Sequence, residues 1–357
     1  MMFRTLFLLF ISFTAITSAD AQEPWAIMTG QSIVEVRSGL RHIYSRLGRK
    51  DLVAALDSAA VTDLLSGNLK GLDLNRPLGC VIVPNRSGLG SAITFVPTSG
   101  EQAFLDFLRR HLLTVNIDSN SLSSVSIPLV GTVYIRFEQN YAWFAFAAED
   151  LNGPMPDLSK VIPESHRKVQ LATTIYLERL PTDQRQVWLQ RSQQGFEWLL
   201  KGSTQGSGQL VESLGLPMAG LLTKRLAEDA KEVTIYAHAD RSTDQLWARI
   251  LVTPRPNVPW VTQVQQYAAS PVRYEIPASF WATLRGKTDE TAARAAQTAF
   301  KKGESDKLVL TMKGGDQLEL KAELSGAMLA YHAALDQGES KPTLKERIQE
   351  RRRNKRK

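Results

Sequence analysis

The chain has 357 residues, of which 43% are hydrophobic and 22% are charged, and its formal net charge is +7. These proportions are typical of folded globular proteins and exclude an intrinsically disordered chain, and a single cysteine excludes an intramolecular disulfide. Residues 341–357 hold nine of the 43 Lys and Arg and two of the 36 Asp and Glu, so 34 of each sign remain elsewhere. The body of the chain is therefore neutral, and the net charge belongs to the tail.

The first 21 residues have the pattern of a secretory signal peptide. Arg4 gives a positive start, an apolar run follows from Leu6 to Ile16, and Ala19-Asp20-Ala21 has the small residues of a cleavage site. A membrane-spanning helix needs about 20 consecutive apolar residues, roughly twice the length of this run. We therefore expect cleavage near Gln22, a secreted or periplasmic protein, and no transmembrane segment in the mature chain.

The elements of the first half are predicted from hydrophobic spacing and turn residues. Helical spacing covers Gln31–Leu47 and Asp51–Leu65, and a third amphipathic helix follows Ser99. Short apolar runs predict one hairpin from Leu78–Val83 and Ser91–Val96 and another from Thr132–Phe137 and Tyr141–Ala148. Because the last of these runs is apolar on both faces, we expect that strand to be central or covered on both faces.

The second half repeats this order of elements. Strands are predicted at Val169–Leu177, Val233–Ala239 and Leu246–Thr253. Helices are predicted at Thr182–Leu200, near Val211–Ala230, at Trp260–Tyr267 and near Glu290–Lys302. A last hairpin is predicted from Leu308–Met312 and Gln317–Leu324. The sequence thus predicts an α+β fold of two similar successive domains, residues 22–160 and 161–337, each with an antiparallel sheet packed by helices. Residues 338–357 are predicted to be a disordered basic tail.

Several segments resemble a group of secreted proteins of unknown function that are abundant in planctomycete bacteria. They are the stretch from Gly71 to Gly79, Phe95-Val96-Pro97 before a helix with Phe104-Leu105, and Val133-Tyr134-Ile135-Arg136 followed by Tyr141-Ala142. The resemblance implies a secreted, duplicated α+β protein. It carries no activity and no catalytic position to this chain.

A search for residues with catalytic or metal-binding spacing predicts no such site and no cofactor. No two of the five histidines lie within five residues of each other, and His238 with Asp240 is too small a set to hold zinc. Cys80 lies in an apolar run that is typical of a buried strand rather than of a reactive thiol. The adjacent acids Glu149 and Asp150 point in different directions on any regular element, whereas a glycosidase needs two facing carboxyl groups. The aromatic residues between Tyr134 and Phe146 are better explained as core than as a sugar-stacking platform.

The basic tail is the one segment with a specific binding hypothesis. A solvated end that keeps a neutral body soluble is the simpler interpretation, and attachment to an anionic envelope polymer, lipid headgroups or extracellular nucleic acid is the functional one. The candidate binding residues are Arg347, Arg351, Arg352, Arg353, Lys355, Arg356 and Lys357. For the whole chain we expect a non-enzymatic binding or envelope-associated protein whose partner is an unknown protein or envelope polymer, without specific nucleic-acid binding. The alternative is an extracytoplasmic hydrolase with a carboxylate pair contributed by distant segments.

Overall fold

The computed structural model describes residues 23–57, 71–84, 90–110, 114–117, 122–127, 131–182, 184–187, 228–256, 258, 270–284, 287–300 and 306–337. The predicted signal peptide and the basic tail lie outside these residues. So do the helix predicted at 260–267 and most of the helices predicted at 182–200 and 211–230.

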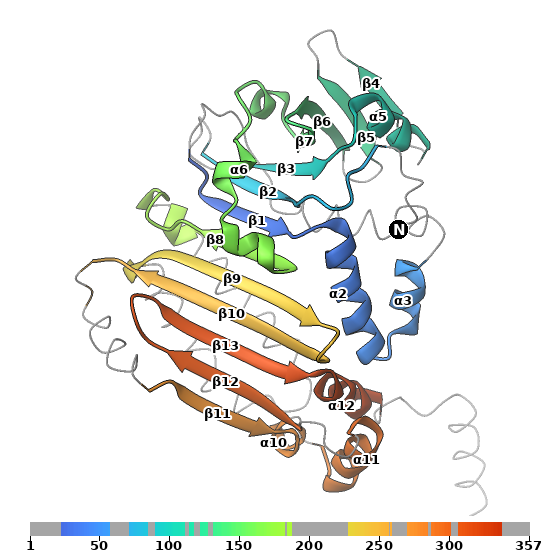
Figure 1. Ribbon diagram of the computed structural model, residues 1–357, viewed down its shortest axis with the longest axis vertical. Coiled ribbons are helices and arrows are strands. Elements are labelled where there is room, and N and C mark those ends of the chain that lie inside the picture. Colours follow the sequence, from blue (N-terminus) through green and yellow to red (C-terminus); the bar gives the residue numbers. More distant parts are fainter. Residues whose placement is uncertain are drawn as a thin grey trace, which may run out of the picture.

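Within the described residues, thirteen strands form one antiparallel sheet (Figure 1). The strands are β1 (Ala26–Gly30), β2 (Leu78–Val83), β3 (Ser91–Pro97), β4 (Thr114–Ile117), β5 (Ser123–Ile127), β6 (Gly131–Glu138), β7 (Tyr141–Ala145), β8 (Leu171–Ile175), β9 (Ala230–Asp240), β10 (Gln245–Pro254), β11 (Val272–Pro277), β12 (Lys307–Lys313) and β13 (Leu318–Ser325). Their order across the sheet is β11-β12-β13-β10-β9-β8-β1-β2-β3-β7-β6-β5-β4. Strands from the two halves of the chain thus occupy the two halves of a single sheet.

Helices and 3-10 turns lie against this sheet and at its ends (Figure 1). They are α2 (Ile33–Arg46), α3 (Lys50–Leu56), α5 (Glu101–Arg110), η1 (Ala148–Leu151), α6 (Leu158–Val161), η2 (Glu164–Lys168), α10 (Ala278–Leu284), α11 (Asp289–Ala299) and α12 (Gly326–Gln337). Among the described helices, none is both long enough and apolar enough to cross a membrane.

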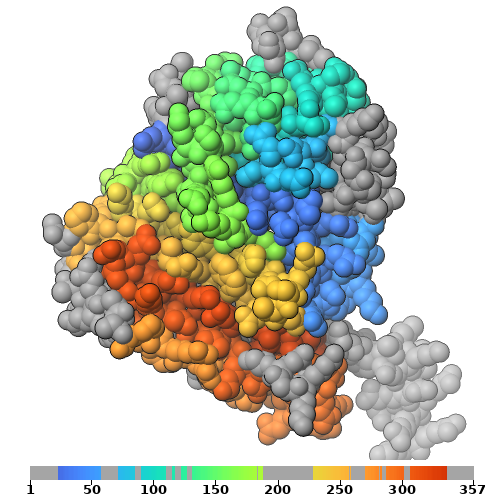
Figure 2. Space-filling view, in the orientation of Figure 1, coloured from blue at the N-terminus to red at the C-terminus, as the bar shows by residue number. Residues whose placement is uncertain are grey.

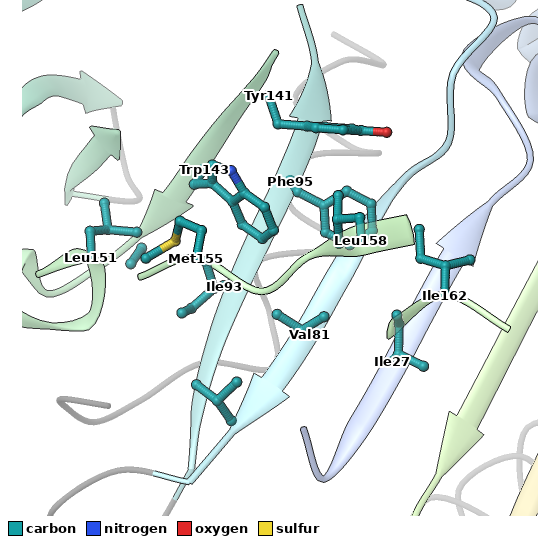
Figure 3. Close-up of a cluster of buried hydrophobic side chains, with 12 residues drawn as sticks. Ile27, Val81, Ile93, Phe95, Tyr141, Trp143, Leu151, Met155, Leu158 and Ile162 are labelled. Atoms are coloured by element: carbon teal, nitrogen blue, oxygen red, sulfur yellow. The ribbon is translucent and has the colours of Figure 1, made fainter. Parts of the chain in front are cut away.

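Both faces of the sheet are buried in the first half. On one face α5 supplies Phe104 and Leu108, which pack with Val96 and Phe144. On the other face the segment from η1 to α6 covers a second cluster that contains Trp143 (Figure 3). Every residue of β3 and β7 is buried, which confirms that the apolar strand at 141–145 is central.

In the second half the two faces of the sheet differ in chemistry. The register aligns Ile235, Ile250, Leu320 and Met312 in one apolar row across β9, β10, β13 and β12. The neighbouring row, which faces the opposite way, contains Arg249, bonded to Glu319 across the strands at 2.7 Å. Helices α10, α11 and α12 form their own cluster at one end of the apolar face with Leu308 and Leu324. This half is less deeply buried, because β12 and β13 contain no fully buried residue.

The two halves meet along β1 and β8, which pair antiparallel from Ala26↔Ile175 to Gly30↔Leu171. Next to this seam, within the second half, the Gln170 side-chain amide joins the start of β8 to β9, because it donates to Ala239 O at 3.1 Å and accepts from Ala239 N at 2.9 Å. Helix α2 runs from the end of β1 toward the turn between β9 and β10 (Figure 1), where Arg46 contacts Asp244 at 2.8 Å. The sheet therefore continues across residue 160, where the sequence predicts a domain boundary.

The predicted hairpins and the strands at 171–175, 230–240 and 245–254 are present at nearly the expected positions. Strands β1, β4, β5 and β11 and helix α10 were not predicted. β4 and β5 are short and rich in Ser, Thr and Asn, so they lack the apolar run that identified the other strands. The coarse prediction of an α+β fold with antiparallel strands and packed helices is confirmed.

Candidate ligand-binding groove

An open groove with a volume of about 440 Å³ lies where several strands of the first half reach the same end of the sheet. β1 ends at Gly30 opposite the start of β2, and β3 ends at Pro97 opposite Tyr141, the first residue of β7. The polar side chains that line the groove come from the segments at these strand ends and from the chain around α6; they are Gln31, Asn75, Arg76, Gln139, Tyr141, Asp157, Ser159 and Arg167. The volume is in the range of small-molecule sites.

Arg76 is held in a fixed place at the groove. Its guanidinium lies 4.3 Å from the centre of the Tyr141 ring, and it donates a hydrogen bond to Asn140 O at 3.3 Å. Tyr141 is buried, and burial raises the pKa of its hydroxyl, although the nearby Arg76 acts in the opposite direction. In Figure 3 the Tyr141 ring lies at one end of the buried cluster, with its hydroxyl directed away from Trp143.

The hairpin turn between β6 and β7 forms part of the groove wall. Gln139 and Asn140 both have positive φ, 57° and 62°, as the tight turn of a two-residue hairpin requires. Asn tolerates this conformation, but a glutamine is unfavourable there. The turn is fixed by the buried Trp143, whose indole N–H donates to Glu138 O at 3.2 Å. The carbonyl that receives Arg76 is therefore placed by the core of the first half.

The opposite wall is formed by α6 and the chain that follows it. Asp157 caps α6 by accepting from Ser159 N at 3.0 Å, and Arg167 donates to Ser159 O at 3.1 Å. The buried side chains of Leu158 and Ile162 join the core beneath and also line the groove (Figure 3). Figure 2 shows the green segment that contains α6 and η2 running across this face from the first half to the second.

A buried polar chain lies next to the groove, under η2. His166 Nδ1 is 2.9 Å from Thr29 Oγ1, and His166 Nε2 is 2.8 Å from Thr174 Oγ1. Thr174 in turn contacts Thr234 Oγ1 at 2.9 Å, so the chain joins β1, β8 and β9. Burial lowers the pKa of His166 to about 4, so the ring is neutral at pH 7. Through its contact with Thr29 in β1, this histidine of η2 links the second half to the first.

Three residues that the sequence analysis considered as candidate site residues contribute to the structure of the sheet and its core. Cys80 is buried in β2, and burial raises the pKa of its thiol to about 12, which confirms the expected core role. Asp150 is 4% exposed and accepts from Ser91 Oγ at 2.9 Å. His238 stacks on Trp247, with ring centres 5.4 Å apart.

The aromatic residues predicted to be core are divided between the two faces of β6 and β7, as Phe144 packs with α5 and Trp143 with α6. Within the described part of the chain, no group of His, Cys, Asp or Glu could hold a metal ion. The tail residues Arg347 to Lys357 lie outside the described residues.

Sequence reasoning missed the groove, because Arg76 and Tyr141 are 65 positions apart and belong to different predicted elements. The one sequence signal was the Asn75-Arg76-Pro77 turn before β2, which was noted only as part of a resemblance. Contact between the two residues depends on the β3–β7 pairing, which joins strands separated by α5, β4, β5 and β6.

Comparison with known proteins shows little similarity. No protein family and no curated protein matches the chain. A solved structure, crystal form III of TP0453, aligns over 89% of this chain and 96% of its own length with 8% identity and a TM-score of 0.33. At that TM-score the alignment supports no conclusion about fold or function.

Proposed function

We propose that this chain is a secreted or periplasmic protein that binds a partner without catalysing a reaction, and that the groove beside Arg76 is its binding site. The observation that carries the proposal is the groove itself, which is lined by guanidinium, amide, phenol, hydroxyl and carboxylate groups from separate elements of the first half and from η2 at the start of the second. Guanidinium and amide groups bind ligands by hydrogen bonds, and a guanidinium stays protonated at physiological pH, so it is a poor general acid or base. The signal-peptide pattern of residues 1–21 supports the location.

Export is tested by expressing the full chain beside a version that lacks residues 1–21. We expect the full chain in the extracytoplasmic fraction with a mature N-terminus near Gln22, measured by intact-protein mass spectrometry. The truncated version should stay in the cytoplasm. An uncut full chain in the cytoplasm would contradict the proposal.

The absence of catalysis is tested with panels of ester, glycoside and peptide substrates. We expect hydrolysis no faster than in buffer. Turnover that is lost in a carboxylate variant would instead support the alternative, an extracytoplasmic hydrolase.

We also propose that the basic tail attaches the protein to an anionic surface through Arg347, Arg351, Arg352, Arg353, Lys355, Arg356 and Lys357. A chain that ends at Ser340 should leave the envelope fraction at low salt, whereas the full chain should leave it only at high salt. Identical fractionation of both chains at both salt concentrations would contradict this role.

An internal duplication is a further part of the proposal. Its support is the strand order counted outward from the seam, which is β1-β2-β3-β7-β6-β5 on one side, with β4 as an additional last strand, and β8-β9-β10-β13-β12-β11 on the other. Superposition of residues 22–160 on 161–337 should align β3 with β10 and β7 with β13. A superposition that fails to align these strands would exclude the duplication.

A further inference from the structure

We propose that the groove binds a compact anionic group, the carboxylate or phosphate of a small ligand, through Arg76 and Arg167. This inference rests on the proposed binding function and names the ligand chemistry. Both guanidiniums line the same groove but approach it from different elements, Arg76 from the turn before β2 and Arg167 from η2.

The two groove arginines differ from most arginines of the described chain in forming no salt bridge with an acidic residue. Arg37, Arg46, Arg136, Arg179 and Arg249, for example, each lie within about 3 Å of a carboxylate oxygen. Arg76 and Arg167 instead donate to backbone carbonyls, those of Asn140 and Ser159. Neither guanidinium forms a salt bridge within the described residues, although the pKa of the Glu164 carboxyl is lowered by Lys168 and, to a smaller extent, by the nearby Arg167.

Arg76 is pre-organised to receive an anion. Its flat guanidinium rests against the buried Tyr141 ring, and its bond to Asn140 O occupies one donor of the five that a guanidinium offers. The remaining donors form a planar fork that matches the two oxygens of a carboxylate or phosphate. Because the side chain is already ordered, binding costs less conformational entropy than it would at a free surface arginine.

The charge balance of the groove also favours an anion. Asp157 is the acidic residue of the lining, and its carboxylate already accepts from Ser159 N and Ser159 Oγ and lies 3.2 Å from Lys160 Nζ. These contacts lower the pKa of Asp157, the Ser159 hydrogen bond most, which keeps the carboxylate ionised and occupied by its own neighbours. Two unpaired guanidiniums thus outweigh one paired carboxylate.

The test measures binding of succinate and of glycerol 1-phosphate to the purified full chain by calorimetry, with sodium chloride at equal ionic strength as the reference. We expect saturable binding of at least one of these probes with one site per chain, and the stronger probe identifies the carboxylate or the phosphate as the preferred group. Arg76→Gln should weaken that binding about tenfold or more, and Arg76→Lys, which keeps the charge but loses the fork, should weaken it less.

Arg109→Gln is the matched control, since Arg109 is an exposed arginine on α5 that pairs with Asp106 outside the groove. It should bind the probe as the unmodified chain does. Arg167→Gln repeats the test at an exposed position if Arg76→Gln does not fold. The inference fails if neither probe binds, or if both groove variants bind like the unmodified chain. Anion binding without export would refute the proposed location alone, and export without anion binding would refute this inference alone.

Discussion

The two halves of the sheet have the same kind of strand pairing but very different burial. β3 and β7 are buried at every residue, whereas every position of β12 and β13 is half-buried or exposed. The difference follows the sequence, because 141–145 is apolar on both faces while 318–325 alternates apolar residues with Glu and Lys. The groove lies on the fully buried half, where the core fixes its walls. A dense core on both faces of a sheet is therefore what holds a polar site in place here.

The largest expected effect comes from truncating one sheet residue in each half. Trp143→Ala should lower the free energy of unfolding by about 3–5 kcal/mol, because it empties a site that is fully buried between β3 and α6. Leu320→Ala should lower it by about 1 kcal/mol or less, because Leu320 is 38% exposed. Urea unfolding of both variants measures the difference. Equal losses would show that the second half is as well packed as the first.

The seam between the halves should make stability depend on pH through His166. The ring has a pKa near 6.5 when unfolded and about 4 when folded, so below pH 6.5 the unfolded state binds more protons. The stabilisation is complete above pH 6.5 and is lost as the pH falls toward 4, by about 3 kcal/mol in total. Unfolding curves from pH 7.5 to 4 measure this loss.

His166→Gln is the control for this loss, because glutamine does not titrate. Its stability should fall less between pH 6.5 and 4 than that of the unmodified chain. The other titratable groups near this ring are Tyr236, which meets His166 edge-on, and Glu232, which accepts a hydrogen bond from Thr234. Both are present in the two proteins, so the difference between the two pH profiles reports on His166. Parallel pH profiles of the two proteins would rule out this role for His166.

A smaller effect is expected from the Gln170 amide, which joins the start of β8 to β9 next to the seam. Gln170→Leu leaves the N–H and C=O of Ala239 without their partners and should cost about 2 kcal/mol in urea unfolding. Asp244→Asn, which weakens the partly exposed contact with Arg46, should cost about 1 kcal/mol or less. If Gln170→Leu costs no more than Asp244→Asn, this buried amide does not fasten the start of β8 to β9.

The smallest expected effect is a gain at the groove turn. Gln139→Gly relieves a positive φ of 57° and should raise the free energy of unfolding by about 0.5 kcal/mol, since part of the relief is offset by the greater freedom of glycine when unfolded. Asp244→Gly, at a similar φ of 54° in the second half, should give no gain, because it also removes the contact with Arg46. A loss of thermal stability in Gln139→Gly would show that the glutamine side chain itself supports the turn.

The sequence by itself determined the local elements with strong periodicity. The run from Leu78 to Val83 and the pair Gly314-Gly315 predicted strands and a turn because apolar alternation and glycine conformation are local properties. The burial of Cys80 also followed from its apolar neighbours. β5, with the sequence SSVSI, was missed because its place in the sheet comes from pairing with β6 and not from its own hydrophobicity.

Only the tertiary structure decided how the halves combine and where the groove lies. The pairing of β1 with β8 joins residues more than 140 positions apart, and no local pattern encodes such a contact. No sequence pattern distinguishes Arg76 and Arg167 from other arginines, and their lack of a salt bridge among the described residues is a property of the tertiary structure. Local propensity acts over a few residues, whereas the charge balance of a site depends on every chain segment that reaches it.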